Sequence, residues 1–111
     1  MKKTIVLLLL FLSLIINAQE KFKGTWQSKT TSYKTVIIAS EYAVLKVFNY
    51  SFEDKNFIEQ DIIKQNNNEF TTVLYNPRNG YKVTINYYMK DENIMCTYIG
   101  DFNGTVILYK K

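Results

Sequence analysis

The acidic side chains and one cysteine are the residues of this 111-residue chain that could carry chemistry, because the sequence contains no histidine. Without histidine, a Ser-His-Asp or Cys-His arrangement cannot be built. Carboxylates remain, and Glu59 and Asp61 would share one face if their segment is a strand. Charged residues at alternate positions are more typical of a solvated outer face than of an acid–base pair. We therefore expect no catalytic residue and no enzyme activity.

Two short acidic stretches could lend oxygen ligands to Ca²⁺, namely Asp91-Glu92 and Asp101 with Asn103. A calcium loop supplies about 6–8 oxygen ligands in a fixed pattern, and neither stretch carries that pattern. Asp and Asn are also common turn formers, so we interpret both stretches as turns. The sequence predicts no metal site and no cofactor.

The single cysteine, Cys96, cannot form an internal disulfide. It lies far from the N-terminal segment, so it is not a lipid-anchoring cysteine. We interpret Cys96 as a small buried residue on a strand. A reactive thiol or an intermolecular bridge is the alternative.

Aromatic residues make up 15% of the chain and offer the best material for a binding site. Aromatic rings line sites for sugars and apolar ligands. The candidate ligand-binding residues are Trp26, Tyr33, Tyr87 and Tyr98. The same rings could instead fill a thin core and its rim, and the sequence leaves both interpretations open.

Eight segments rich in β-branched and aromatic residues are separated by turn residues at intervals of roughly 8–12 residues. They are Gly24–Ser28, Tyr33–Ala39, Ala43–Phe52, Phe57–Gln65, Glu69–Asn76, Tyr81–Lys90, Ile94–Ile99 and Thr105–Lys110. The strongest turn signal is Asn76-Pro77-Arg78-Asn79-Gly80. An all-β, eight-stranded antiparallel up-and-down meander closed into a barrel is predicted, because closure removes both sheet edges. Strands this short predict a barrel without a large cavity.

Alternation of side chains along each segment predicts which residues point inward. These are Trp26, Val36, Ile38, Leu45, Val47, Ile58, Ile62, Leu74, Val83, Ile85, Tyr87, Ile94, Cys96, Val106 and Leu108. One segment is ambiguous, because Ser51-Phe52-Glu53-Asp54 resembles a capping box that could begin a helix over Phe52–Gln65. We favour a hairpin, since alternation also holds there.

The segment Phe22-Lys23-Gly24-Thr25-Trp26-Gln27-Ser28 resembles the first strand of lipocalin-like and avidin-like β-barrels. The resemblance implies that Trp26 closes one end of the barrel beneath a basic residue from the last strand, where this chain offers Lys110. It also implies a small ligand inside the barrel. The other lipocalin motifs are absent, and the single tryptophan departs from the avidin-like pattern.

Residues 1–18 have the pattern of a bacterial secretory signal peptide: a basic start at Lys2-Lys3, an apolar run and a small residue, Ala18. The run from Thr4 to Ile16 is shorter than the ~20 residues that a membrane-spanning helix needs. A retained N-terminal anchor is the alternative. We expect residues 19–111 to form a single small β-barrel domain, secreted or periplasmic, that does not span the membrane after cleavage.

The charge pattern argues against a nucleic-acid partner, because the 14 basic residues are scattered and balanced by 10 acidic ones. The expected function is an exported, non-enzymatic barrel that binds a small apolar ligand. A protein-interaction or inhibitor module acting on another exported protein is the alternative. The segment Thr105–Tyr109 is apolar on both faces, which suggests a homodimer.

Overall fold

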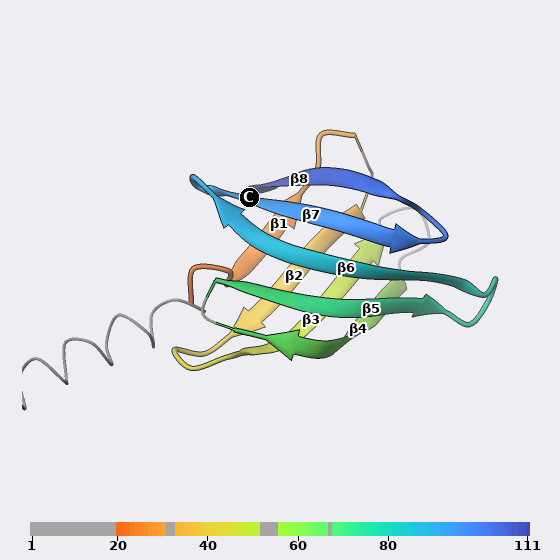
Figure 1. The fold of residues 1–111 in the computed structure, drawn as a ribbon, viewed down its shortest axis with the longest axis horizontal. Coiled ribbons are helices and arrows are strands. Elements are labelled where there is room, and N and C mark those ends of the chain that lie inside the picture. The colour runs from red at the N-terminus through yellow and green to blue at the C-terminus, as the bar shows by residue number, and fades with distance from the viewer. Residues whose placement is uncertain (1–19, 31–32, 52–55, 67) are drawn as a thin grey trace, which may run out of the picture.

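The computed structural model describes residues 20–30, 33–51, 56–66 and 68–111, which form a closed eight-stranded antiparallel barrel (Figure 1). Each strand pairs with its neighbours in sequence, and β8 pairs with β1. The strands are β1 (Gly24–Gln27), β2 (Tyr33–Ala39), β3 (Val44–Ser51), β4 (Asn56–Gln65), β5 (Glu69–Asn76), β6 (Tyr81–Lys90), β7 (Asn93–Gly100) and β8 (Gly104–Lys110). The predicted all-β, up-and-down barrel is confirmed, whereas the predicted signal peptide at 1–18 lies outside the described residues.

The predicted strand bounds agree with the structure to within two residues over the described part of the chain. The turn at Asn76–Gly80 is present, with Gly80 at φ 75° and its N–H donating to the carbonyl oxygen of Asn76 at 2.8 Å. Asn56–Gln65 is a strand, so the hairpin interpretation is confirmed and a helix over those residues is excluded. Residues 52–55 lie outside the described residues.

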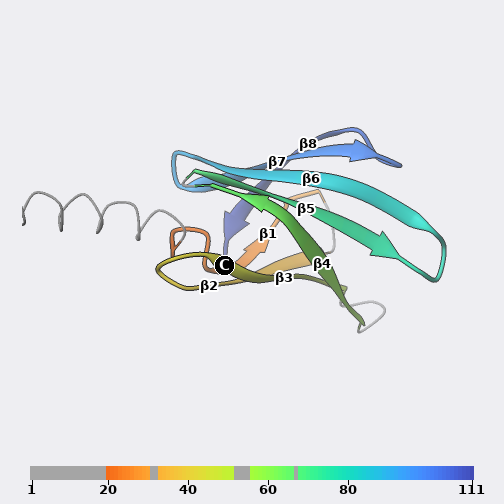
Figure 2. The same cartoon turned by 60° about the horizontal axis from the view of Figure 1, so that its bottom comes forward.

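Strand β4 changes partner halfway along its length. Residues 56–60 pair with β3, and residues 61–65 pair with β5. Figure 2 shows β4 crossing from the layer that contains β2 and β3 to the layer that contains β5 and β6. The ladder between β4 and β5 stops at Asp61 and Val73, so the start of β4 and the end of β5 diverge.

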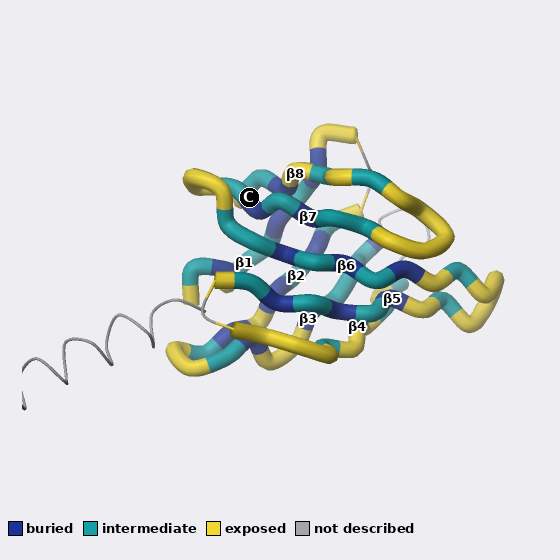
Figure 3. The backbone as a smooth tube through the Cα atoms, in the orientation of Figure 1, coloured by how far each residue is buried: buried dark blue, intermediate teal, exposed yellow. Residues whose placement is uncertain are grey.

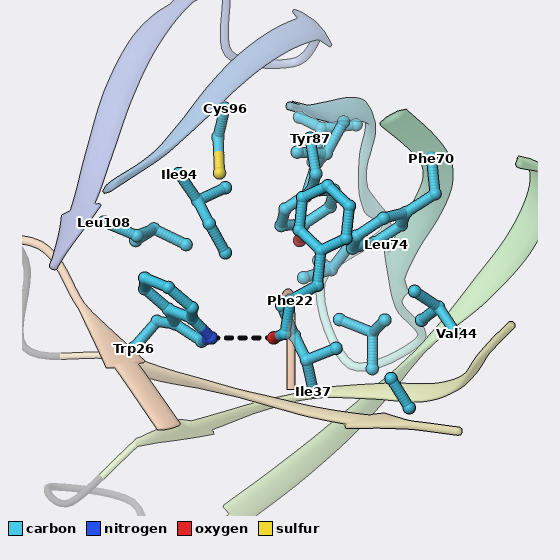
Figure 4. Packing of buried hydrophobic residues seen from close by; sticks show 14 residues of the cluster. Phe22, Trp26, Ile37, Val44, Phe70, Leu74, Tyr87, Ile94, Cys96 and Leu108 are labelled. Carbon is cyan, nitrogen blue, oxygen red and sulfur yellow. Dashed lines mark hydrogen bonds between the residues drawn. The ribbon is translucent and has the colours of Figure 1, made fainter. Parts of the chain in front are cut away.

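One end of the barrel is filled by packed aromatic rings. Phe22 packs edge-on against Phe70 with ring centroids 5.0 Å apart, and Phe70 stacks on Tyr87 at 4.5 Å. The buried indole of Trp26 donates a hydrogen bond from Nε1 to the carbonyl oxygen of Phe22 at 2.9 Å (Figure 4). Aromatic pairs in these geometries stabilise a core beyond their buried area. This is the closed end of the barrel.

Lys110, at the end of β8, reaches over Trp26. Its Nζ lies 5.7 Å from the centroid of the indole ring, within the range of a cation–π contact. Gly24 makes room for this lysine, because a Cβ there would lie 3.1 Å from Lys110 Cε. Gly24 also has φ 133°, a conformation that side chains disfavour. The Gly24-Thr25-Trp26 segment is therefore shaped by its contact with the last strand.

The inward set is largely as predicted, and burial alternates along the strands (Figure 3). Nine of the predicted residues are buried: Trp26, Val47, Leu74, Val83, Ile85, Tyr87, Ile94, Cys96 and Leu108. Three others, Ile58, Ile62 and Val106, pack against this core while partly exposed.

Three inward assignments are wrong: Val36, Ile38 and Leu45. Trp26 lies directly opposite Thr35, and residues opposite each other share a face. The buried indole therefore turns Thr35, with Ile37 and Ala39, into the barrel, which leaves Val36 half-buried and Ile38 44% exposed on the outside. Leu45 is 56% exposed because it is the extra residue of a β-bulge opposite Ile38 and Ala39.

Among the described residues, no helix has the length and apolar character needed to cross a bilayer.

Candidate functional site

The half of the barrel away from Phe22 contains a cavity of about 660 Å³. Its lining comes from the strand ends next to the β5–β6 turn and the β7–β8 loop, at the right of Figure 1. The expectation of a barrel without a large cavity is therefore wrong. The large core rings gather at the closed end, whereas residues such as Ser51, Val83 and Val106 line this half and leave it unfilled.

The walls of the cavity are apolar and aromatic. Four aliphatic and four aromatic side chains line it, namely Ile58, Leu74, Val83, Val106, Tyr33, Tyr81, Tyr98 and Phe102. The rings of Tyr98 and Phe102 meet edge-on, with centroids 5.3 Å apart. Burial raises the pKa of the Tyr98 hydroxyl above its usual range, so this group is a neutral phenol at physiological pH.

A polar cluster centred on Gln60 separates the cavity from the aromatic core. The buried Gln60 Oε1 accepts hydrogen bonds from Tyr87 OH at 2.6 Å and Thr72 Oγ1 at 2.5 Å. Its Nε2 donates to Asn49 Oδ1 at 2.7 Å, and Thr35 Oγ1 donates to the same oxygen at 3.2 Å. Buried polar groups are tolerated when they are paired in this way. Burial raises the pKa of Tyr87 well above its usual range, so its hydroxyl stays protonated.

The two amide side chains of this cluster bond each other end to end. Two hydroxyls donate to Gln60 Oε1, and the NH₂ group forms the other end of the Gln60 side chain. That NH₂ group faces Asn49, which fixes the Asn49 oxygen toward Gln60. The Asn49 NH₂ group consequently lies on the side away from Gln60, and Asn49 itself lines the cavity.

The mouth of the cavity carries Arg78, the only arginine of the chain. An arginine cannot accept a hydrogen bond, so the Asn56 amide orients its oxygen toward the guanidinium, at 2.9 Å from Nη1 and 3.1 Å from Nη2. Arg78 belongs to the β5–β6 turn and Asn56 begins β4. This pair therefore spans the place where β4 and β5 diverge.

A second cavity of about 350 Å³ occupies that divergence. It shares Asn56, Ile58, Asn76 and Arg78 with the larger cavity. The mouth of the barrel therefore continues onto the outer surface between β4 and β5, where exposed residues such as Phe57 and Tyr75 line this pocket.

The larger cavity has one charged lining residue among those that the structure describes. Arg78 carries a positive charge, and no described Asp, Glu or Lys side chain lines the cavity with it. The nearby Asp101 accepts a hydrogen bond from the backbone N–H of Lys82 at 2.9 Å. Burial, with the charge of Asp101 as the second cause, raises the pKa of Tyr81.

Two of the four predicted ligand-binding residues, Tyr33 and Tyr98, line the cavity. The other two, Trp26 and Tyr87, lie in the aromatic packing below it. Contact of any of the four with a ligand stays a prediction. The sequence reasoning missed the polar lining, although Asn49 and Gln60 do occupy inward positions of their alternating segments.

Arg78 gave no usable signal, because a charged residue in a turn is normal on any protein surface. The candidates for other chemistry lie elsewhere. Glu59 and Asp61 are exposed on the outer face of β4. Within the described residues, no group of three or more acidic, cysteine or histidine side chains could hold a metal ion. Cys96 is buried on β7 as predicted, and burial raises the pKa of its thiol.

No protein family, curated protein or solved structure matches this chain. It is a small antiparallel β-barrel with one packed end and one open end, and the open end contains an amphipathic cavity.

Proposed function

We propose that this protein is an exported, non-enzymatic binding protein that holds a small molecule in the open half of its barrel. The cavity of about 660 Å³ carries the proposal. Its volume falls within the range of roughly 300–1,000 Å³ that ligand pockets occupy. The pattern of residues 1–18 supports export, because a short basic start before an apolar run is typical of a secretory signal.

The composition of the cavity wall indicates what kind of molecule fits. Aliphatic and aromatic side chains form about half of the described lining, and the polar side chains include Asn49 beside the Gln60 cluster and Arg78 in the β5–β6 turn. Moving apolar surface from water into such a space is favourable by about 25 cal/mol per Å². The apolar part of a ligand would therefore lie against Ile58, Leu74 and Val106, with its polar part at one end.

The geometry of the closed end supports placing the protein among lipocalin-like barrels. Trp26 is buried there and Lys110 lies over its ring, as the resemblance of the Gly24-Thr25-Trp26 segment implies. A plugged end and an open end are what a carrier of small molecules needs, because ligand exchange then occurs at one mouth.

The test uses two neighbouring residues of β8 that face opposite ways. Val106 lines the cavity, whereas Ile107 is 39% exposed on the outside. Binding of the neutral fluorescent probe phenylnaphthylamine would be titrated with the unmodified protein and with the Val106→Trp and Ile107→Trp variants. We expect the unmodified protein and Ile107→Trp to bind alike. Val106→Trp should bind at least about tenfold more weakly, because the indole occupies the ligand's volume.

Native mass spectrometry of the purified protein would show whether a small molecule accompanies it. Failure of the unmodified protein to bind the probe, together with no accompanying ligand, would contradict the proposal. Equal binding by both tryptophan variants would place the probe outside the barrel and would also contradict it.

A protein-interaction role is the second candidate, favoured by an aromatic cluster on the outer face of β3 and β4. Phe57 is 64% exposed, and its ring lies 4.6 Å from Tyr50 and 6.3 Å from Phe48, centroid to centroid. Exposed apolar patches of this kind mark interaction sites. The partner would be another exported protein or a second copy of this chain. Sedimentation of the unmodified protein and of Phe57→Ser distinguishes them: a monomer in both cases argues against the homodimer.

A further inference from the structure

The side-chain oxygens of the asparagines around the cavity accept hydrogen bonds from other groups of the protein. Asn49 Oδ1 accepts from Gln60 and Thr35 at the floor. At the mouth, Asn56 Oδ1 accepts two N–H groups of the Arg78 guanidinium.

The two asparagines of the β5–β6 turn also accept hydrogen bonds through their side-chain oxygens. Asn76 Oδ1 accepts from the backbone N–H of Arg78 at 3.0 Å, and Asn79 Oδ1 accepts from the backbone N–H of Tyr81 at 2.9 Å. All four asparagines line the cavity. Each of these side chains also carries an NH₂ group, which only donates hydrogen bonds.

Arg78 adds further donors and the only formal charge of the described lining. A guanidinium has five N–H groups, and two of its nitrogens are engaged with Asn56. Arg78 forms no ion pair with a carboxylate of the described residues, and the outward-facing Glu59 lines the smaller pocket with it. The described polar lining therefore has many donors and one positive charge, and hydroxyls such as those of Thr30, Tyr33 and Tyr81 can donate or accept.

We infer that the ligand of this site is a carboxylate with an apolar body, which places its anionic group at Arg78 and its apolar part against the barrel wall. The inference rests on the proposed function. A carboxylate supplies acceptors only, and it matches the forked geometry of a guanidinium. Its charge is not opposed by any acidic residue of the described lining.

Other ligand chemistries fit the lining less well. A sugar presents many hydroxyl groups and little apolar surface, whereas aliphatic and aromatic side chains make up about half of the described lining residues. A cationic ligand would be repelled by the positive charge of Arg78. A wholly apolar molecule would gain nothing from the charge of Arg78.

The test compares two probes that differ only at the head group, naphthoate and naphthamide. Their binding is measured by calorimetry to the unmodified protein, to Arg78→Gln and to Lys82→Gln. Lys82 is the matched control, because it is an exposed cation at the start of β6 that does not line the cavity. Retained Trp26 fluorescence and an unchanged melting temperature would show that each variant is folded.

We expect naphthoate to bind the unmodified protein about tenfold more tightly than naphthamide, the size expected of a charge-assisted hydrogen bond at a partly exposed site. Arg78→Gln should abolish that preference by weakening naphthoate alone. Arg78→Lys should retain part of it, and Lys82→Gln should leave it unchanged.

Equal affinity for the two probes would overturn the inference and leave the proposed binding function standing. A loss in Lys82→Gln equal to that in Arg78→Gln would also overturn it, because general charge attraction would then explain the preference. If neither probe bound and phenylnaphthylamine did not bind either, the proposed function itself would fail.

Discussion

Replacing Gln60 with leucine should destabilise the barrel, because this side chain is the shared acceptor for two buried hydroxyls. Tyr87 OH and Thr72 Oγ1 both donate to Gln60 Oε1, and both residues are almost inaccessible to solvent. Leucine has a similar volume and no acceptor, so the change removes the hydrogen bonds without opening a large void.

The magnitude follows from the two donors left behind. A buried donor without a partner costs about 1–3 kcal/mol, so two donors give about 2–6 kcal/mol. The neighbouring cavity can admit water to part of the cluster, which places the expected loss near about 3 kcal/mol. Small domains have only about 5–15 kcal/mol of stability, and the urea midpoint should fall by about 1–3 M.

The assay is urea unfolding followed by fluorescence of Trp26, the single tryptophan of the chain. Glu59→Leu is the control, since Glu59 is the adjacent outward residue and should change stability by less than about 0.5 kcal/mol. Adding Thr72→Val and Tyr87→Phe to Gln60→Leu should restore at least half of the loss, because the unpaired hydroxyls are then gone.

A Gln60→Leu protein as stable as the unmodified one would refute this reasoning. It would mean that the two hydroxyls reach water or other acceptors once Gln60 is absent.

Three further outcomes follow from burial and backbone geometry. Burial raises the pKa of Tyr87 and Tyr98. The free energy of unfolding should therefore keep its full value below pH ~10, the pKa of tyrosine in the unfolded chain, and should fall as the pH rises toward the pKa values of the folded protein. Ultraviolet absorbance should show these two phenols ionising only with unfolding. Cys96 is buried and the pKa of its thiol is raised, so a thiol reagent should modify it only under denaturing conditions, and rapid reaction of the folded protein would be the opposite result. Gly100→Ala should cost more stability than Gly80→Ala, by about 1–2 kcal/mol. A Cβ at Gly100 would lie 2.7 Å from a backbone oxygen of β6, whereas a Cβ at Gly80 meets nothing within 4 Å. Equal urea midpoints for the two variants would contradict this.

The strands were predictable from sequence because their signals are local. Alternating residues over Tyr81–Lys90 and the Asn76–Gly80 turn depend only on neighbours in the chain, and both are where the pattern placed them. Which side chains of β2 point into the barrel does not depend on local sequence. It was set by the pairing of Trp26 with Thr35, and the apolar residues on both faces of β2 gave no means of choosing between them.

The candidate site was only partly predictable for the same reason. Tyr33 and Tyr98 could be proposed because aromatic rings are themselves a signal. The contact between Arg78 and Asn56 could not, because it joins a turn to a strand that begins 22 positions earlier. The cavity lies where β4 and β5 diverge, at the end opposite the packed aromatic rings. Neither feature is determined by the residues of a single segment, so neither could be predicted from local patterns.

The central claim is that the open half of the barrel binds a carboxylate at Arg78 while the end plugged by Trp26 takes no part. The chain has one tryptophan and one arginine, so the Trp26 indole N–H and the Arg78 Nε–H are each identifiable without assignment in a nitrogen–proton NMR spectrum. Titration with naphthoate should shift the Arg78 signal in a saturable way and leave the Trp26 signal nearly unmoved. A saturable shift of Trp26 with Arg78 unmoved, or no saturable shift of either, would contradict the account.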